Sequence, residues 1–230
     1  MDELHLRLLR VGFTAGDDLG LVLAGGYALA AHDLVKRPSR DIDFATATTL
    51  PLPAVAARLV DAYVAAGFDA RIIEATARMA RLMVTATGQA CEVDLLKEAI
   101  GPPAALNLGP VLAFDDAVGL KMRALHERAA HRDYIDIHAA NDRLPRPDLE
   151  SLGARHTVGF SLEELADRLG AIGELDDETF TAYGLTDPRI VELHGWALDW
   201  EADIRFRLAN GETGPVPVVG DEWDAYLDRL

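Results

Sequence analysis

Hydrophobic and polar residues follow two different periods in the first part of the chain. Apolar residues at helical spacing, or favourable helix starts, indicate helices over 2–11, 28–34 and 51–66. Short apolar runs and strict alternation indicate strands over 21–24, 41–45, 68–75, 79–86 and 90–96. Thr87-Gly88-Gln89 favours a hairpin turn between the last two strands. This part of the chain therefore mixes strands with helices.

The pattern changes after a stretch rich in glycine and proline, from Gly101-Pro102-Pro103 to Gly109-Pro110. Beyond it, only helical periodicity is found, over 115–129, 131–142, 148–154, 161–169, 176–183 and 187–208. Strands mixed with helices, followed by helices alone, indicate an α+β fold, an α/β head with a helical tail. We expect the head to span 1–100 and the helical region 111–230.

Composition and charge narrow the class of protein. Lys and Arg number 22 against 38 Asp and Glu, a formal net charge of −16. Such a charge excludes proteins whose overall field attracts nucleic acid or anionic membranes, although a local basic pocket stays open. The single cysteine, Cys91, excludes an intramolecular disulfide and a Cys-rich zinc site. No apolar run approaches the ~20 residues of a membrane span, so we expect a cytoplasmic globular protein with no membrane partner.

Two features of the head suggest binding of an anion and of a cation. Gly25-Gly26 stands between a strand and a helix, where backbone N–H groups are free to meet a phosphate, although a simple turn explains the pair equally well. Asp41 and Asp43 lie two apart on a strand, so both carboxylates share one face while Ile42 and Phe44 face the core. Neighbouring carboxylates repel each other unless a cation such as Mg²⁺ lies between them.

Three further residues, Glu92, Asp94 and Lys121, carry charges that need a partner. Glu92 and Asp94 share one face of the strand 90–96, which is either a third source of metal ligands or the solvated face of an antiparallel strand. Asp41, Asp43 and Asp94 together would supply carboxylates for two divalent ions. Lys121 leans toward the apolar stripe of its helix, so it either meets an anionic partner or extends past the stripe to water.

These residues carry a resemblance to known enzymes. LAGGYALAAHDLVKRPSRDIDF (23–44) resembles the signature of the nucleotidyltransferase superfamily. Within it, the segment 37–43 and FDDAVGLKMRALHERAAHRDYIDIHAA (114–140) resemble the AbiEii/AbiGii-type toxin family, in the order in which that family has them. The resemblance implies a nucleotidyltransferase-like mixed β-sheet with flanking helices, followed by a helical C-terminal region that completes the nucleotide and acceptor cleft.

The resemblance also implies roles for the residues of the head. Gly25 and Gly26 would cradle the triphosphate, and Ser39 would bind phosphate or help to place the metal. Asp41 and Asp43 would be metal ligands. Asp94 would be the third carboxylate, acting as general base or metal ligand.

The resemblance also bears on residues later in the chain and, in the head, on Glu92 and Tyr27. Lys121 would bind the nucleotide and neutralise its triphosphate. Asp133 matches the family's Arg-Asp-x-x-Asp element and is preferred over Asp136. Glu92 would replace Asp94 if the strand register differed by one pair. Tyr27 stands where the superfamily usually has a small residue, so its ring would narrow the nucleotide pocket or stack on a base.

The implied activity is magnesium-dependent transfer of NMP from an NTP to an acceptor hydroxyl, with two Mg²⁺ ions and with Mn²⁺ as a substitute. The acceptor would be the 3′ end of tRNA, or the protein itself, in a toxin–antitoxin or phage-defence system with a cognate antitoxin. One alternative is nucleotidylation of a small cationic molecule of the aminoglycoside kind, which an acidic protein would attract. Another is a non-catalytic protein of the same fold that binds a nucleotide or a partner.

Overall fold

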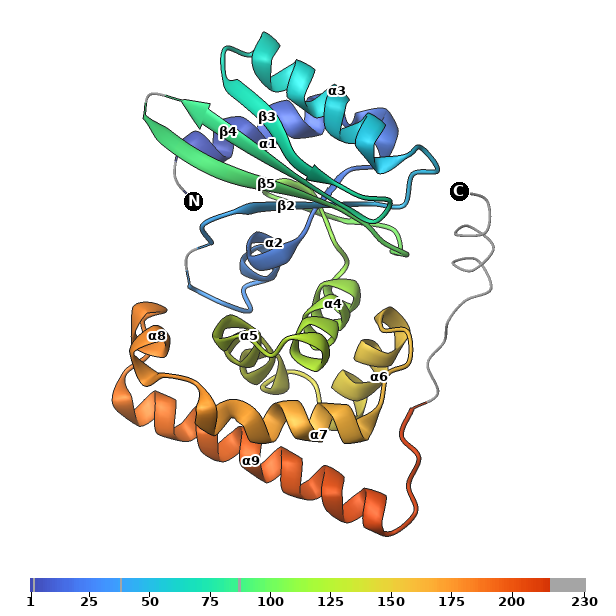
Figure 1. Cartoon of the computed structure of the whole chain (residues 1–230), viewed down its shortest axis with the longest axis vertical. Coiled ribbons are helices and arrows are strands. Elements are labelled where there is room, and N and C mark those ends of the chain that lie inside the picture. Colours follow the sequence, from blue (N-terminus) through green and yellow to red (C-terminus); the bar gives the residue numbers. More distant parts are fainter. Residues whose placement is uncertain (2, 38, 87, 216–230) are drawn as a thin grey trace. The chain divides into compact units, whose positions relative to one another are not determined.

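The computed structural model describes residues 1, 3–37, 39–86 and 88–215. The chain divides into two compact units, Met1–Phe114 and Asp115–Leu230, and Figure 1 shows the elements of each. The first unit holds all the strands of the described residues, and the second is helical. Among the helices of this described part, none combines the length and the hydropathy of a membrane span.

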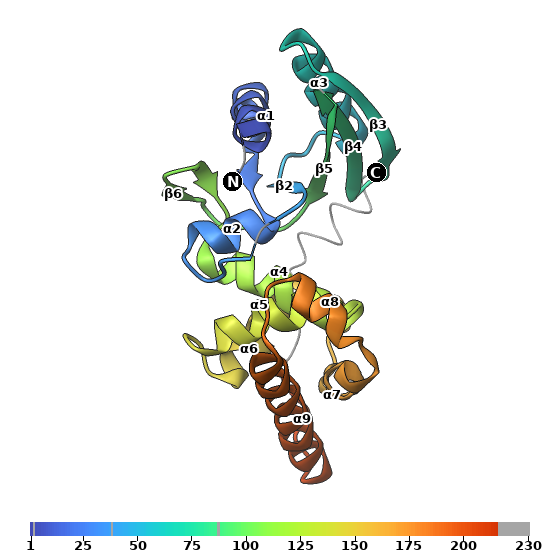
Figure 2. The same cartoon turned by 90° about the vertical axis from the view of Figure 1, so that its left-hand side faces the viewer.

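The first unit is built on a mixed seven-stranded sheet with the order β3-β4-β5-β2-β1-β7-β6. Its strands are β1 (Val22–Leu23), β2 (Ile42–Thr46), β3 (Asp69–Ala75), β4 (Met79–Ala86), β5 (Gln89–Lys97), β6 (Ala104–Leu106) and β7 (Gly109–Val111). The pairs β2–β5 and β1–β7 are parallel, and the other neighbours are antiparallel. The edges β3 and β6 lie on opposite sides in Figure 2. The predicted α+β fold with a mixed sheet is confirmed.

Helices cover this sheet and define its two faces. They are α1 (Glu3–Ala15), the 3₁₀ turn η1 (Asp17–Leu19), α2 (Gly25–Ala31) and α3 (Leu52–Ala65). In Figure 1, α1 and α3 lie against one face and α2 lies on the other side. The covered face holds the fully buried side chains of Phe44, Tyr63 and Val93. Gly12 of α1 allows close approach there, because a Cβ at this position would lie 2.5 Å from the Phe44 ring. The opposite face of β2 and β5 remains available for polar side chains.

The edge strand β3 contains an irregularity. Ile72 pairs with Leu82, but the next pair is Glu74 with Arg81, so Ile73 is an extra residue in β3. Such a bulge bends and twists an edge strand. Its effect here is to place Glu74, rather than Ile73, opposite Arg81.

The strand predictions over 68–75, 79–86 and 90–96 are confirmed by β3, β4 and β5. The hairpin is also present, because Ala86 pairs with Gln89, although the expected turn residue Thr87 lies outside the described residues. The glycine- and proline-rich stretch between the two predicted parts also contains two strands that the sequence pattern did not indicate. β6 and β7 are each three residues long, and Pro110 lies within β7, opposite Ala105 of the edge strand β6.

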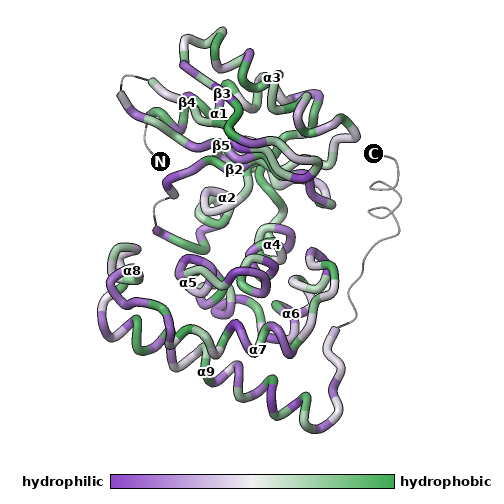
Figure 3. Tube along the Cα trace, in the orientation of Figure 1, coloured by the Kyte–Doolittle hydropathy of each residue, from purple (hydrophilic) through white to green (hydrophobic). Residues whose placement is uncertain are grey.

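The second unit packs its helices around a core of leucine, isoleucine and aromatic residues. The helices are α4 (Phe114–Glu127, whose first residue closes the first unit), α5 (His131–Asn141), α6 (Arg146–His156), α7 (Leu162–Gly170), α8 (Asp177–Ala182) and α9 (Asp187–Ala209), with a 3₁₀ turn η2 (Ala171–Glu174). Hydrophobic and hydrophilic residues recur in turn along these helices in Figure 3. The long helix α9 runs beside α7 in Figure 1 and buries Leu193, Trp200 and Ile204.

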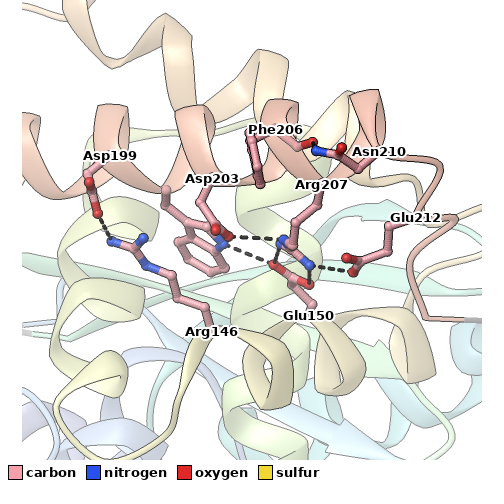
Figure 4. A network of polar contacts seen from close by, with 9 residues as sticks. Arg146, Glu150, Asp199, Asp203, Phe206, Arg207, Asn210 and Glu212 are labelled. Atoms are coloured by element: carbon pink, nitrogen blue, oxygen red, sulfur yellow. Dashed lines mark hydrogen bonds and ion pairs between the residues drawn. The ribbon is translucent and has the colours of Figure 1, made fainter.

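A polar network ties α9 to α6, as Figure 4 shows. The carboxylate of Glu150 is almost fully buried and receives hydrogen bonds from the indole N–H of Trp200 at 3.0 Å and from two nitrogens of Arg207 at 3.1 and 2.5 Å. Arg207 also meets Asp203 at 3.0 Å and Glu212 at 2.7 Å. A buried carboxylate held by this many donors fixes the C-terminal end of α9.

Candidate active site

The start of α2 lies directly against β2. The Ala24 N–H donates to the Asp43 carbonyl oxygen at 2.8 Å, which joins the end of β1 to β2. Gly25 follows with φ +57°, and a Cβ on it would lie 1.8 Å from Asp43 Oδ2. A Cβ on Gly26 would lie 2.8 Å from Ser39 Oγ. The two glycines therefore let a carboxylate and a hydroxyl lie against the first turn of α2.

Asp41 and Asp43 share the face that α1 and α3 do not cover. Both side chains are half-buried, whereas Ile42 and Phe44 are fully buried on the opposite face. The predicted alternation is therefore confirmed. The Ser39 hydroxyl donates to Asp41 Oδ1 at 2.8 Å, which fixes the orientation of that carboxylate. Ser39, Asp41 and Asp43 thus form a compact group of oxygen atoms beside the start of α2.

Asp94 lies on the same face, one strand away. The parallel pairing of β2 with β5 sets Asp94 directly beside Asp43. Asp94 is 8% exposed, and both of its oxygens accept hydrogen bonds from Arg81, at 2.8 Å from Nε and 2.7 Å from Nη2. Glu92 lies 3.6 Å from Arg81 Nη1. These hydrogen bonds with Asp94 raise the pKa of the Arg81 guanidinium, while its partial burial opposes the shift.

From the sequence, Arg81 and Arg78 are either contacts for phosphates or ordinary exposed strand arginines, and no motif marks Arg81 as the partner of Asp94. The hairpin contained the necessary signal, because a two-residue turn that pairs Ala86 with Gln89 also pairs Arg81 with Asp94. Residues directly opposite each other on one face of an antiparallel pair are close enough to interact. Counting back from the turn would therefore have predicted this ion pair.

The oxygens of this group suit a magnesium ion. Magnesium prefers hard oxygen ligands, and it retains water and phosphate oxygens in the rest of its shell. Asp41 and Asp43 supply carboxylates, and the glycine at 25 leaves the space in which the Asp43 carboxylate lies. Asp94 is engaged by Arg81, and within 1, 3–37, 39–86 and 88–215 no three His, Cys, Asp or Glu side chains gather closely enough to hold a metal. The donor chemistry fits the ion, with the carboxylates of Asp41 and Asp43 as the ligands that would hold it.

Tyr27 is buried beside the segment that carries Ser39. The residue is 8% exposed, its hydroxyl lies 2.5 Å from His5 Nδ1, and that hydroxyl donates to the Ser39 carbonyl oxygen at 3.3 Å. The expectation that its ring narrows the nucleotide pocket or stacks on a base stays a prediction. A phenol ring that is buried needs a partner for its hydroxyl, and here that partner includes the backbone of Ser39. Tyr27 links α1 and α2 to the segment that carries Ser39.

The second unit contains its own buried charge cluster. Lys121 is 8% exposed, and its ammonium lies 3.0 Å from Asp136 Oδ2 and 3.9 Å from Asp133 Oδ1. Of the two alternatives for Lys121, the structure shows the inward one, with Asp136 and Asp133 as the anionic partners, and its contact with the triphosphate stays a prediction. Charge pairing of this kind offsets much of the cost of placing an ammonium group in a buried position.

Asp133 caps the N-terminal end of α5. Its carboxylate is fully buried, accepts the Ala130 N–H at 3.1 Å and receives two hydrogen bonds from Arg128, at 2.9 and 3.0 Å. A carboxylate at this position satisfies a backbone donor that the helix leaves free. Asp133 thus has structural partners on several sides, and Asp136 is the closer partner of Lys121. The catalytic role expected of Asp133 stays a prediction.

Comparisons with known proteins show which solved structures share this fold and which sequence family the chain matches. MenT4, a nucleotidyltransferase toxin from Mycobacterium tuberculosis H37Rv, superposes with a TM-score of 0.59 at 17% identity, over 87% of this chain and 82% of that one. A Helicobacter pylori protein described as a nucleotidyltransferase superposes with a TM-score of 0.56 at 17% identity, over 92% and 99%. A sequence search among curated proteins finds no match. Residues 7–229 match the family described as nucleotidyl transferase AbiEii toxin, type IV TA system. The chain therefore belongs to the AbiEii family of nucleotidyltransferase toxins.

Proposed function

We propose that this nucleotidyltransferase transfers NMP from an NTP to the 3′ end of tRNA, in a magnesium-dependent reaction, as the toxin of a toxin–antitoxin system. The observation that carries the proposal is the group made by Ser39, Asp41 and Asp43 at the start of α2, in a chain of the AbiEii family. We propose that residues 1–100 form the catalytic part. The expectation that residues 111–230 complete the cleft for the nucleotide and the acceptor stays a prediction.

The chemistry is a single displacement at phosphorus. The acceptor hydroxyl oxygen forms a bond to the α-phosphorus, the bond from the α-phosphorus to the bridging oxygen breaks, and pyrophosphate leaves. The hydroxyl proton passes to a carboxylate of the site, and Asp94 acts either as this general base or as a third metal ligand. Bound magnesium supplies positive charge for the triphosphate and lowers the pKa of the attacking hydroxyl.

The residues of this chain position the metal ligands and the phosphates of the substrate. Ser39 orients Asp41 through its hydrogen bond, and Gly25 leaves room for the Asp43 carboxylate, so the two metal ligands are held before the substrate binds. Gly26 and the first N–H groups of α2 would meet phosphate oxygens. Lys121 keeps the role that the family resemblance gives it, neutralising the leaving pyrophosphate.

The experiment is transfer from each of four α-labelled NTPs to total tRNA, with magnesium. The test variant is Asp41→Asn/Asp43→Asn. The control is Asp61→Asn/Asp69→Asn, which removes the same charge from exposed positions on α3 and β3. We expect label on tRNA from the wild type and the control, and a loss of at least about 100-fold in the test variant, since even supporting residues around a metal cost 10–100-fold.

Two results would contradict the proposal. Label that persists in Asp41→Asn/Asp43→Asn would remove these residues from the metal site. If no variant labels tRNA, the acceptor is different, and aminoglycosides and the protein itself are tested next. The net charge of −16 is the observation that favours a small cationic acceptor as the second candidate. An antitoxin would be sought in the neighbouring reading frame.

A further inference from the structure

Arg81 stands among the carboxylates of the candidate site. Along β4, Ala80, Leu82 and Val84 are fully buried, so Arg81 extends from the opposite face, where Asp94 lies directly across from it. Its guanidinium holds both oxygens of Asp94. The side chain is nevertheless 39% exposed, whereas that of Asp94 is 11% exposed. The arginine therefore has room to move, and the aspartate is fixed.

Three acidic residues, Asp94, Glu92 and Asp41, act on this guanidinium through their charge, and a fourth, Glu74, pairs with Arg81 through the backbone of the next strand. Asp94 and Glu92 belong to β5, and the bulge in β3 sets Glu74 directly opposite Arg81. Asp41, just before β2, acts on Arg81 through its charge and adds to the rise in the pKa of the guanidinium. One monovalent cation thus occupies a position within an acidic group that otherwise suits a divalent cation.

The ion pair and a metal compete for the same carboxylate. Asp94 lies beside Asp43, a proposed metal ligand, and both oxygens of Asp94 accept hydrogen bonds from Arg81. A bidentate arginine–carboxylate pair is among the stronger hydrogen-bonded pairs in proteins. A divalent cation that recruits Asp94 must displace Arg81, and the displaced guanidinium then needs another anion. Phosphate oxygens match the guanidinium fork as well as a carboxylate does.

We propose that Arg81 is an exchangeable counterion that withholds Asp94 from divalent cations until a nucleoside triphosphate arrives, and then binds its phosphates. The inference rests on the proposed function, because it assumes that the metal and the nucleotide bind beside Asp41 and Asp43. It adds a regulatory step to that function. Metal alone binds weakly, and the nucleotide and the metal bind cooperatively, because the triphosphate releases the carboxylate that the metal requires.

The first test is titration of the full-length protein with Mn²⁺ by calorimetry, without nucleotide. In Arg81→Gln we expect the affinity for Mn²⁺ to rise about tenfold, a coupling within the usual range for linked sites. The matched control is Arg78→Gln, which removes a guanidinium that approaches Glu98 at 4.0 Å and not Asp94. An equal rise in both variants would show a general effect of charge and overturn the inference. In Arg81→Gln/Asp94→Asn the rise should disappear.

The second test uses a non-hydrolysable NTP analogue with Mn²⁺ present. Here Arg81→Gln should bind the analogue about tenfold more weakly than the wild type, because the phosphates lose a charged partner. Opposite changes in the two titrations are what a merely structural arginine would not produce. Arg81→Lys keeps the charge without the bidentate fork, so its Mn²⁺ affinity should lie between those of the wild type and Arg81→Gln. This variant replaces Arg81→Gln in both titrations if Arg81→Gln does not fold.

Asp41→Asn separates failure of this inference from failure of the proposed function. If Asp41→Asn weakens Mn²⁺ binding but Arg81→Gln leaves it unchanged, the metal site stands and the counterion role is wrong. If Asp41→Asn leaves Mn²⁺ binding unchanged, or the wild type and Arg81→Gln bind no Mn²⁺, the proposed metal site itself is wrong and the inference falls with it.

Discussion

Gly25 and Gly20 have nearly the same backbone conformation in different surroundings. Their φ values are +57° and +59°, but a Cβ on Gly25 would lie 1.8 Å from the Asp43 carboxylate, whereas one on Gly20 would meet nothing within 4 Å. The pair therefore separates the cost of a left-handed backbone from the cost of displacing a site residue.

We expect Gly20→Ala to lower the free energy of unfolding by about 1 kcal/mol, the cost of the left-handed conformation. Gly25→Ala should lose a further ~1–3 kcal/mol from steric overlap and, because Asp43 must move, most of the nucleotidyl transfer. Urea denaturation and transfer assays of the two variants check this. Equal activity in both would mean that the position of the Asp43 carboxylate is not important for the reaction.

His126 links stability to pH in the second unit. Its side chain is 5% exposed, its ring stacks on Phe160, and Nε2 accepts the Ser161 N–H at 3.2 Å. Burial lowers its pKa below the ordinary 6.5, although the neighbouring Glu164 opposes this shift. The unfolded chain therefore binds a proton more readily than the folded one. The stabilisation is complete above about pH 6.5 and is lost as pH falls toward the folded pKa.

The expected result is a free energy of unfolding that decreases between pH 7.5 and 5.5, and that decreases less steeply in His126→Gln. Burial lowers the pKa of His138 in the same direction, so the variant should retain part of the slope. Urea titrations followed by tryptophan fluorescence report on this unit, since Trp196 and Trp200 both lie in α9. Parallel slopes in wild type and variant would contradict a neutral, buried His126.

At the scale of elements, one helix offers a buried and an exposed ion pair for comparison. Arg207 of α9 holds the almost fully buried Glu150, while Arg205, two residues before, holds Asp167 at positions that are 43% and 64% exposed. Removing one partner of a buried pair leaves an uncompensated charge, whereas an exposed pair is screened by water.

We expect Arg207→Ala to cost about 3 kcal/mol of unfolding free energy and to loosen the end of α9. Arg205→Ala should cost less than about 1 kcal/mol. Thermal and urea denaturation measure both, and hydrogen exchange over α6 and α9 locates the change. A similar small loss in the two variants would mean that solvent reaches Glu150 and replaces the missing guanidinium.

The helices and strands were largely predictable from the sequence, but the side chains that pair with one another were not. Alternation along 79–86 and 90–96 indicated β4 and β5, because a strand that buries one face shows that period directly in its sequence. The pairing of Asp94 with Arg81 depends on register, which was available only by counting from the hairpin turn. The capping of α5 by Asp133 depends on where Arg128 ends α4, which no local pattern specifies.

At the scale of the whole molecule, net charge constrains the acceptor. A surplus of sixteen acidic residues repels RNA at long range, so binding of tRNA would depend on local basic groups and on salt. The same surplus attracts small polyamines to acidic surfaces. Family membership gives the class of reaction, and the charge of the molecule makes the choice of acceptor a question for the labelling experiment.

The bulge in β3 also affects how this protein behaves when it is concentrated. An edge strand presents unpaired backbone groups that can recruit a strand from another molecule, and here Ile72 and Ile73 are 40% and 48% exposed. The extra residue at Ile73 interrupts the regular row of donors and acceptors, so an incoming strand cannot stay in register along it. We therefore expect the extra residue at Ile73 to make this apolar edge less able to recruit strands from other molecules.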